Sequence, residues 1–392
     1  MTTRRIDVLD VLRGIAIMGT LGTNIWIFTD PLGPAGVMDA LSGSGAADTF
    51  LHFLANGKFL ALLSLLFGVG MELQYRSAVR RGVTWPGRYL WRAALLFVEG
   101  LLHYVLIFEF DVLMGYAVVS VLVAFLIGRS DRVVRAWMIV TGTVFAAVIG
   151  LITLALLYGV ADLSSGAAPS RRFAEGGYLD QVTARIVNMG TYRFEAVFIV
   201  PLGVVLFLLG SRLVRAGVFE DSERGAVLRR RLMVLGLGVG APLNLLTAFS
   251  GEGWFLVDRY LLPPLVALGL LGLVTTVALR AGDVQGRMRR GLTAVGRTAL
   301  SCYVFQNLAG AVLCYGWGLG LATRFEGLRP WWTVAAWAAI CAVFMALATL
   351  WLRRFERGPL EILWQRAYLM SWRPARETTV TDDKITDNSP QG

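Results

Sequence analysis

Ten mostly apolar stretches run along the chain, and each is close to the length of about 20 residues that crosses the hydrocarbon core of a bilayer. Inside lipid, every backbone polar group must find its partner within the protein, and a continuous apolar run of this length is typical of a helix. The sequence therefore predicts an all-α, polytopic membrane helix bundle with about ten transmembrane helices. The predicted spans are 12–28, 58–75, 91–108, 112–128, 136–158, 194–211, 232–249, 260–279, 299–320 and 332–352.

Composition argues for the same class of protein. Apolar and aromatic residues fill 56% of the 392 positions and charged residues only 16%, whereas soluble domains carry about 25% charged residues. This balance argues against soluble enzymes and against disordered, collagen-like and small disulfide-rich proteins. Cys302, Cys314 and Cys341 lie in late apolar stretches without metal-ligand spacing, so we expect neither a disulfide framework nor a metal site.

The basic residues predict the orientation in the membrane. The net charge is +10, and Lys58 and Lys384 are the only lysines among 37 basic residues. With the N-terminus in the cytoplasm, all but eight of these residues fall on the cytoplasmic side, as the positive-inside rule requires. We therefore expect a multi-pass plasma-membrane protein, N-in and C-in, whose arginines meet membrane lipids. No long basic run is present, so no nucleic-acid partner is expected.

The segments between the spans predict one membrane domain, residues 1–372, followed by a disordered polar cytoplasmic tail, residues 373–392. Residues 29–57 and 159–193 are the two long outer segments. The second carries Leu179, Val182, Ile186 and Met189 at helical spacing, which predicts an amphipathic helix flat on the outer interface that could cover a cavity. The oligomeric state is not determined by the sequence, and a homo-oligomer is one option.

Ionisable side chains within apolar spans are costly and usually face a cavity or a partner, so they are the best candidates for a functional site. His103, one of two histidines, lies in the third span with Glu99 one turn earlier on the same face. Asp111 follows eight residues later at the outer turn. A histidine next to a carboxylate can hold one tautomer and act as a general base. A structural polar pair that joins two helices is the alternative.

Polar residues on the first two spans extend this set. Asp10 and Arg13 are spaced i, i+3 at the cytoplasmic end of the first span, where they can pair or present a guanidinium to a phosphate. Asn24 lies further along the same face, although an interhelical hydrogen bond would explain it equally well. Lys58 begins the second span on the outer side, where snorkelling to the interface is the simple explanation.

The ninth span contributes a second polar face. Arg297 lies at its cytoplasmic end, and Tyr303, Gln306 and Asn307 share one side of the helix at spacings of i, i+3 and i+4. Three polar residues inside one span suggest a face directed towards protein or water.

Together these residues fall in stretches that resemble the YeiB-like membrane proteins, also called the domain-of-unknown-function-418 family. The resemblance covers nearly the whole chain, without the tail. The matching stretches are Leu9-Asp10-Val11-Leu12-Arg13-Gly14-Ile15-Ala16; Lys58-Phe59-Leu60 through Leu66-Phe67-Gly68-Val69-Gly70; His103 followed by Asp111-Val112-Leu113 and Tyr116; Gly296-Arg297-Thr298-Ala299-Leu300 with Tyr303 and Gln306; and Arg357-Gly358-Pro359-Leu360-Glu361 with Trp364.

That family looks distantly similar to transmembrane acyltransferases, which move an acyl group from cytoplasmic acyl-CoA to an acceptor presented outside. The shared element is the opening Leu-Asp-x-Leu-Arg-Gly. Acyltransferase-3 proteins carry a catalytic His at the position occupied here by Asn24. The resemblance therefore implies that the catalytic role moves to His103, as in the branch that acetylates terminal glucosamine, or that the chemistry has been lost. Ser301-Cys302-Tyr303 replaces the usual Thr-Asn-Tyr.

Three hypotheses follow. In the first, acyl-CoA is a cosubstrate bound through Arg13 and Arg297, and His103 acts as base or acyl carrier for a small-molecule, glycan or lipid-linked acceptor. The second is a transporter or flippase with His103 and Glu99 as a proton relay. The third is a partner subunit without chemistry. The predicted catalytic residues are His103, Glu99 and Asp111; the predicted substrate-binding residues are Asp10, Arg13, Asn24, Lys58, Arg297, Tyr303 and Gln306.

Overall fold

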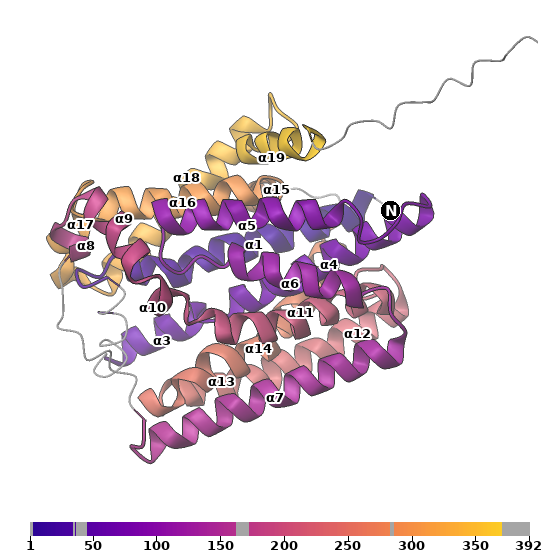
Figure 1. Cartoon of the computed structure of the whole chain (residues 1–392), viewed down its shortest axis with the longest axis horizontal. Helices are drawn as coiled ribbons and strands as arrows, with labels where there is room; N and C mark the ends of the chain where they lie inside the picture. The colour runs from indigo at the N-terminus through magenta and orange to yellow at the C-terminus, as the bar shows by residue number, and fades with distance from the viewer. Residues whose placement is uncertain (1–2, 34–35, 37–44, 162–171, 283–285, 371–392) are drawn as a thin grey trace, which may run out of the picture.

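We describe the fold from a computed structural model of the chain that covers residues 3–33, 36, 45–161, 172–282 and 286–370. Within these ranges the regular structure is helical and no strand occurs (Figure 1). The predicted all-α bundle is therefore confirmed. The predicted tail, residues 373–392, lies outside the described residues, as do parts of both long outer segments.

Every predicted span corresponds to a helix. Eight helices of the described chain are long and apolar enough to cross a membrane, and two apolar helices are shorter. The main helices are α1 (Thr3–Phe28), α4 (Lys58–Arg80), α5 (Tyr89–Leu106), α6 (Leu113–Leu126), α7 (Asp131–Leu157), α11 (Ala196–Ala216), α12 (Glu223–Met233), α13 (Ala241–Ala248), α14 (Pro263–Arg280), α15 (Arg287–Arg297), α16 (Ala299–Cys314), α18 (Trp331–Trp351) and α19 (Pro359–Met370).

Short elements connect these helices. α12 and α13 are joined by a π-helical segment, η1 (Val234–Gly240), and a second one, η3 (Val257–Leu261), precedes α14. Such segments widen the helix by one residue per turn and often occur at functional positions. The remaining elements are α3 (Ala46–Ala55), α8 (Arg172–Glu175), α9 (Tyr178–Val187), α10 (Met189–Arg193), α17 (Leu321–Arg324), and the 3₁₀ turns η2 (Glu252–Trp254) and η4 (Glu326–Leu328).

The ninth span differs from its predicted bounds of 299–320. α16 ends at Cys314 because Tyr315 adopts an extended conformation. Gly320 then takes a positive φ of 62°, which an L-residue rarely adopts. At its other end α16 begins at Ala299, as predicted, and a break at Thr298 separates it from α15.

α15 lies directly against α1, although its sequence reads as part of a cytoplasmic connection. A Cβ atom at Gly14 would lie 2.1 Å from the Leu292 carbonyl oxygen, and one at Gly296 would lie 1.8 Å from the Asp10 carbonyl oxygen. Glycine at both positions therefore allows the two backbones to touch. This contact brings Arg297 to the Asp10–Arg13 end of α1.

Lipid-facing and buried helices are clearly distinguished. α1 is the most enclosed of the long spans, whereas α7 runs along one edge of the bundle, where Ile139 and Leu151 are 65% and 67% exposed (Figure 1). α19 lies on the opposite edge, outside the layer formed by α5 and α16. Exposed apolar side chains on peripheral helices fit a protein whose solvent is lipid.

Within the outer segment 159–193, α9 is amphipathic as predicted, but its polar face is buried in the protein and its apolar face is exposed. Leu179 and Ile186 are exposed, whereas Gln181 and Arg185 are buried. Arg185 Nε donates to Glu109 Oε1 at 2.9 Å in the turn that joins α5 to α6. Burial raises the pKa of Glu109, and the charge of Arg185 offsets only part of that rise. α9 therefore holds the α5–α6 turn by its polar face and leaves its apolar face outward.

Candidate functional site

The site begins at the closed end of the α5–α6 hairpin. α5 ends at Leu106, and Asp111 precedes α6, where its Oδ2 accepts a hydrogen bond from the backbone N–H of Met114 at 3.0 Å. Its Oδ1 lies 3.0 Å from Nδ1 of His103 on α5. Both side chains are buried. One carboxylate therefore caps the second helix and positions the histidine of the first.

The partners of His103 determine its tautomer. Because ionised Asp111 only accepts, Nδ1 of the imidazole carries the hydrogen. Nε2 is then a lone pair, and it accepts from Nδ2 of Asn307 at 3.3 Å. The orientation of the Asn307 amide is set in turn, because its Oδ1 accepts from Asn24 Nδ2 at 3.1 Å. The result is one chain of donors and acceptors from the α5–α6 turn through α5 and α16 to α1, with the basic nitrogen directed at Asn307.

The surroundings of the imidazole are polar and aromatic. The ring centroid of Tyr303 lies 5.1 Å from that of His103, and Phe108 lies 6.5 Å away. The Tyr303 hydroxyl is near the backbone of Val112 but makes no hydrogen bond of good geometry within the described residues. A buried hydroxyl without a partner is costly, so it is a candidate for contact with a ligand.

Of the two carboxylates proposed to orient His103, the structure selects Asp111. Glu99 is half-buried on α5, and its Oε2 makes no hydrogen bond within the described part of the chain. Along the sequence Glu99 is the nearer carboxylate, four residues from His103, whereas Asp111 is eight residues away. The hairpin turn brings Asp111 closer through space.

Residues that sequence reasoning missed hold the turn in place. Arg193 of α10 donates to the Asp111 carbonyl oxygen at 2.9 Å, and its guanidinium lies over the Tyr104 ring, 5.1 Å from the centroid. The Tyr104 hydroxyl donates to the Arg185 carbonyl oxygen. These contacts join residues about 80 positions apart, and no local spacing would have signalled them.

A cavity of about 900 Å³ leads towards this site, and we call it the main cavity. Helices α1, α4, α5, α6, α15, α16 and α19 line it. Exposed or half-exposed arginines mark its open side, whereas buried Leu113 and Tyr303 mark the end near His103. His103 itself does not line the cavity; the Tyr303 ring lies beside it. The arginines that line the cavity are Arg13, Arg81, Arg88, Arg92, Arg297 and Arg357.

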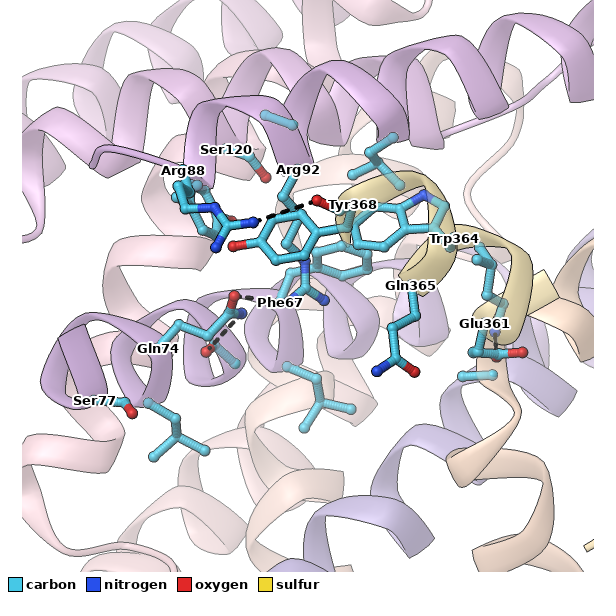
Figure 2. A pocket seen from close by; sticks show the side chains of 18 of the residues that line it. Phe67, Gln74, Ser77, Arg88, Arg92, Ser120, Glu361, Trp364, Gln365 and Tyr368 are labelled. Carbon is cyan, nitrogen blue, oxygen red and sulfur yellow. Dashed lines mark hydrogen bonds between the residues drawn. The ribbon is translucent and has the colours of Figure 1, made fainter. Parts of the chain in front are cut away.

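The arginines of the main cavity are held by neutral partners as well as by charge. Arg13 pairs with Asp10 at 2.9 Å, as predicted. Arg92 donates to Gln74 Oε1 at 2.7 Å, and Arg297 donates to the Glu356 carbonyl oxygen at 3.1 Å. A guanidinium has five N–H donors, so these three side chains can still meet an anion. Figure 2 shows Arg88, just before α5, and Arg92 of α5 facing Gln74 and the aromatic residues of α19.

α19 forms one wall of the main cavity and is fastened to α16 by reciprocal capping. The Glu361 carboxylate accepts from the backbone N–H groups of Leu300 and Ser301 at 2.8 and 3.2 Å. In return, Ser301 Oγ accepts from the N–H of Leu360 at 3.0 Å. Each helix thus satisfies the N-terminal donors of the other. Trp364, Gln365 and Tyr368 of α19 consequently face the cavity (Figure 2).

The other predicted site residues separate into two groups. Asn24 belongs to the hydrogen-bond chain of His103. Gln306 is fully buried and donates to the Ile17 carbonyl oxygen of α1 at 3.1 Å, a contact between helices rather than with the cavity.

Lys58 lies elsewhere, and it does not extend to the interface as the snorkelling interpretation expected. It is 3% exposed, its ammonium donates to the Phe53 carbonyl oxygen, and it lies 4.0 Å from the centroid of the Phe53 ring. Nearby, Asp258 accepts hydrogen bonds from Asn56 at 2.8 Å and from Asn244 at 2.6 Å. This cluster links α4 to the π-helical segment η3 and is separate from the main cavity.

No group of three His, Cys, Asp or Glu side chains within the described residues could hold a metal ion. The three cysteines are buried and unpaired.

Comparison with known proteins supports the family resemblance. Residues 213–371 match the family described as "Protein of unknown function (DUF418)". The chain is 28% identical to the uncharacterized protein YxaH of Bacillus subtilis, over 97% of this chain and 98% of the relative. It is 27% identical to the uncharacterized protein YeiB of Escherichia coli, over 95% and 98%. A 39.9 kDa uncharacterized protein of Bacillus acidopullulyticus is 24% identical over 92% and 93%.

Proposed function

Since the chain is a YeiB-like DUF418 protein, we propose that it transfers an acyl group from acyl-CoA to an acceptor hydroxyl or amine. One observation carries the proposal: a histidine with a fixed tautomer lies beside the Tyr303 end of a cavity whose open side carries several arginines. The family is described as one of unknown function, so membership does not indicate an activity. The proposal therefore depends on the chemistry of the site.

The main cavity suits the shape and charge of acyl-CoA. Arg13, Arg92 and Arg297 come from three different helices and offer planar donors to phosphates. On α5, Arg92 and Leu96 line the cavity, and His103 continues the same helical face about 10 Å beyond Leu96. A pantetheine arm is long and thin, so the phosphates could remain among the arginines while the thioester approaches Tyr303.

The transfer step can be written with the residues of this chain. The acceptor displaces the long hydrogen bond from Asn307, and its hydroxyl gives a proton to His103 Nε2 as its oxygen attacks the thioester carbonyl carbon. The new C–O bond forms, the C–S bond breaks, and the imidazolium returns the proton to the departing CoA sulfur. Asp111 stabilises the imidazolium. The Tyr303 hydroxyl is available to donate to the oxyanion.

Replacing His103 tests this proposal. We expect His103→Ala protein, purified and reconstituted with labelled acetyl-CoA, to lose acetyl transfer by about 10²–10⁴-fold, the usual contribution of general-base catalysis. His52→Ala is the matched control, because His52 stacks on Trp26 at 3.9 Å between ring centroids and does not line the main cavity. Wild-type turnover in folded His103→Ala protein would refute the mechanism.

A transporter or flippase is the second candidate, favoured by the two π-helical segments. η1 and η3 interrupt the regular helices, and Asn244 and Asp258 are hydrogen-bonded between them. Broken helices with polar residues inside a bundle are common in transporters. Mass spectrometry of the substrate separates the two functions, because transport leaves its mass unchanged and acyl transfer increases it by the acyl group.

A further inference from the structure

A second hollow lies on the other side of the α5–α6 hairpin, and we call it the lateral groove. It has a volume of about 490 Å³ and is formed by α5, α6, α10 and α11. Its lining is apolar except for one arginine, Arg193. Phe97 and Val118 in its walls are 40% and 41% exposed, on a surface rich in exposed apolar side chains. In a membrane protein such a surface contacts lipid tails, so the groove opens sideways into the bilayer.

The hairpin separates the lateral groove from the main cavity. On α5, Leu96 faces the main cavity and the next residue, Phe97, faces the groove. On α6, Leu113 faces the cavity and Met114 faces the groove. His103 and Asp111 lie at the closed end of this hairpin. The proposed base and its partner are therefore placed between the two hollows.

The wall between the groove and Asp111 is thin. A Cβ atom at Gly100 would lie 2.6 Å from the Met114 backbone nitrogen and 2.9 Å from Asp111 Oδ2. A residue larger than glycine would push the two helices apart. Met114 lines the groove and donates its N–H to the same carboxylate oxygen. A group bound in the groove thus comes close to the partner of the proposed catalytic histidine.

Arg193 gives the groove a charge preference. Its guanidinium donates to the Asp111 carbonyl oxygen and covers the Tyr104 ring, which leaves further N–H donors at the end of an apolar groove. An apolar groove with an arginine at one end matches a molecule with a long hydrocarbon chain and an anionic head group. Phosphate is the common anion of membrane lipids, and guanidinium binds it in a bidentate manner.

We propose that the acyl acceptor is a lipid whose phosphate-bearing head group carries a hydroxyl, and that it reaches the site from the bilayer through the lateral groove. This inference rests on the proposed function. The lipid hydroxyl becomes the acceptor oxygen in the step already described: it gives its proton to His103 and forms the ester bond as the thioester C–S bond breaks.

Photolabelling tests the binding of such a lipid without any need for activity. The full chain in nanodiscs would be exposed to phosphatidic acid with a diazirine in its acyl chain, and separately to the corresponding diacylglycerol, which lacks the phosphate. We expect labelling of Phe97, Met114 and Val118, and at least about a tenfold preference for phosphatidic acid, the lower end of what one hydrogen bond to a charged group contributes. Arg193→Gln should remove the preference. Equal labelling by both lipids, or none in the groove, would overturn the inference.

Gly190 allows the groove to be filled. A Cβ atom at Gly190 would meet nothing within 4 Å, so the side chain of Gly190→Phe has room to enter the groove and should block its labelling. Gly150→Phe on α7 is the matched control, because that glycine is equally unobstructed and does not line the groove. Labelling that persists in Gly190→Phe protein would contradict the assignment.

The acceptor itself is tested with a matched pair of probes. Phosphatidylglycerol carries a phosphate and hydroxyls on a lipid, and glycerol 3-phosphate carries the same head group without chains. With labelled acetyl-CoA, we expect acetyl label in phosphatidylglycerol, reduced by Gly190→Phe but not by Gly150→Phe. Label only in glycerol 3-phosphate would overturn the inference and leave acyl transfer intact. Label in neither product would count against the proposed function, while photolabelling would still decide whether the groove binds lipid.

Discussion

The hydrogen-bond partners of His103 determine which of its two ring nitrogens carries the hydrogen. Asp111 can only accept, so it places the hydrogen on Nδ1 and leaves Nε2 as the basic atom. Asn24 orients the Asn307 amide so that its N–H faces Nε2. Residues of α1, α5 and α16 and of the α5–α6 turn thus determine one protonation state.

Replacing Asp111 by asparagine tests this arrangement. His103 Nδ1–H and the Met114 N–H bind different oxygens of the carboxylate, so the single oxygen of an amide can accept from only one of them. The amide also cannot stabilise the imidazolium by charge. We expect Asp111→Asn to lower the rate of acetyl transfer by about 10²–10⁴-fold with little change in the KM for acetyl-CoA. Glu99→Gln serves as the comparison, because the side-chain hydrogen bonds of His103 go to Asp111 and Asn307 and not to Glu99, and it should be affected far less. Equal losses in the two variants would contradict the assignment.

Whole helices are held at the main cavity in two ways, by close backbone contact and by hydrogen bonds between helix ends. α15 can lie on α1 only because Gly14 and Gly296 present no Cβ at the contact. α19 is held to α16 by the exchange between Glu361 and Ser301. Both contacts bring arginines or aromatic residues to the main cavity, so the packing of these helices decides what the cavity displays.

The contact between α1 and α15 can be disturbed by one methyl group. A Cβ at position 296 would lie 1.8 Å from the Asp10 carbonyl oxygen, so the helices must separate. We expect Gly296→Ala to lower the free energy of unfolding by about 1–3 kcal/mol, measured as a drop in melting temperature in detergent. Gly150→Ala, at a helix position with open space, should be neutral or slightly stabilising. A neutral Gly296→Ala variant would show that the contact is looser than described.

The joint between α16 and α19 depends on a carboxylate at a helix N-terminus. Glu361→Gln keeps one oxygen acceptor but removes the charge that favours this end of α16. We expect a loss of about 0.5–2 kcal/mol in the free energy of unfolding, together with a higher KM for acetyl-CoA because α19 lines the cavity. Glu356→Gln, on the exposed segment before α19, is the control. An unchanged melting temperature and KM would argue against this role.

Considered as a whole, the molecule places two hollows of different character on either side of one hairpin. The main cavity carries arginines, and the lateral groove is apolar with a single arginine. A water-soluble anionic substrate and a lipid would therefore approach the same histidine by separate routes. This arrangement requires the arginine side of the main cavity to face the cytoplasm, where acyl-CoA occurs.

The orientation predicted from the arginines can be tested at the two ends of one span. Glu223 and Glu252 are both exposed, and residues 223–248 form the membrane-crossing helix between them. The native cysteines are buried, so a cysteine introduced at either position should dominate labelling. We expect a membrane-impermeant maleimide to label Glu252→Cys in intact cells and Glu223→Cys only after lysis. The reverse pattern would invert the topology and remove the cytoplasmic access that acyl-CoA requires.

Several features of the site could be predicted because their signal is local. The pairing of Asp10 with Arg13 follows from their spacing on one helix, and the choice of His103 as a candidate follows from the rarity of ionisable residues in apolar spans. The choice of Asp111 over Glu99 could not be made, because it depends on how six residues fold back at the hairpin turn. Arg193 gave no signal at all: it lies in an outer segment, where an arginine is ordinary.

The sequence alone determines that the chain is a helical membrane bundle and where most of its helices lie. In lipid the backbone of such an apolar stretch can satisfy its hydrogen bonds only within the protein, and a helix does this within one segment. Only the tertiary structure decides which polar groups meet. Asn24, Asn307 and His103 come from distant positions, and their contact depends on the angles at which α1, α5 and α16 cross. Those angles arise from side-chain packing between helices, which no periodicity along one helix encodes.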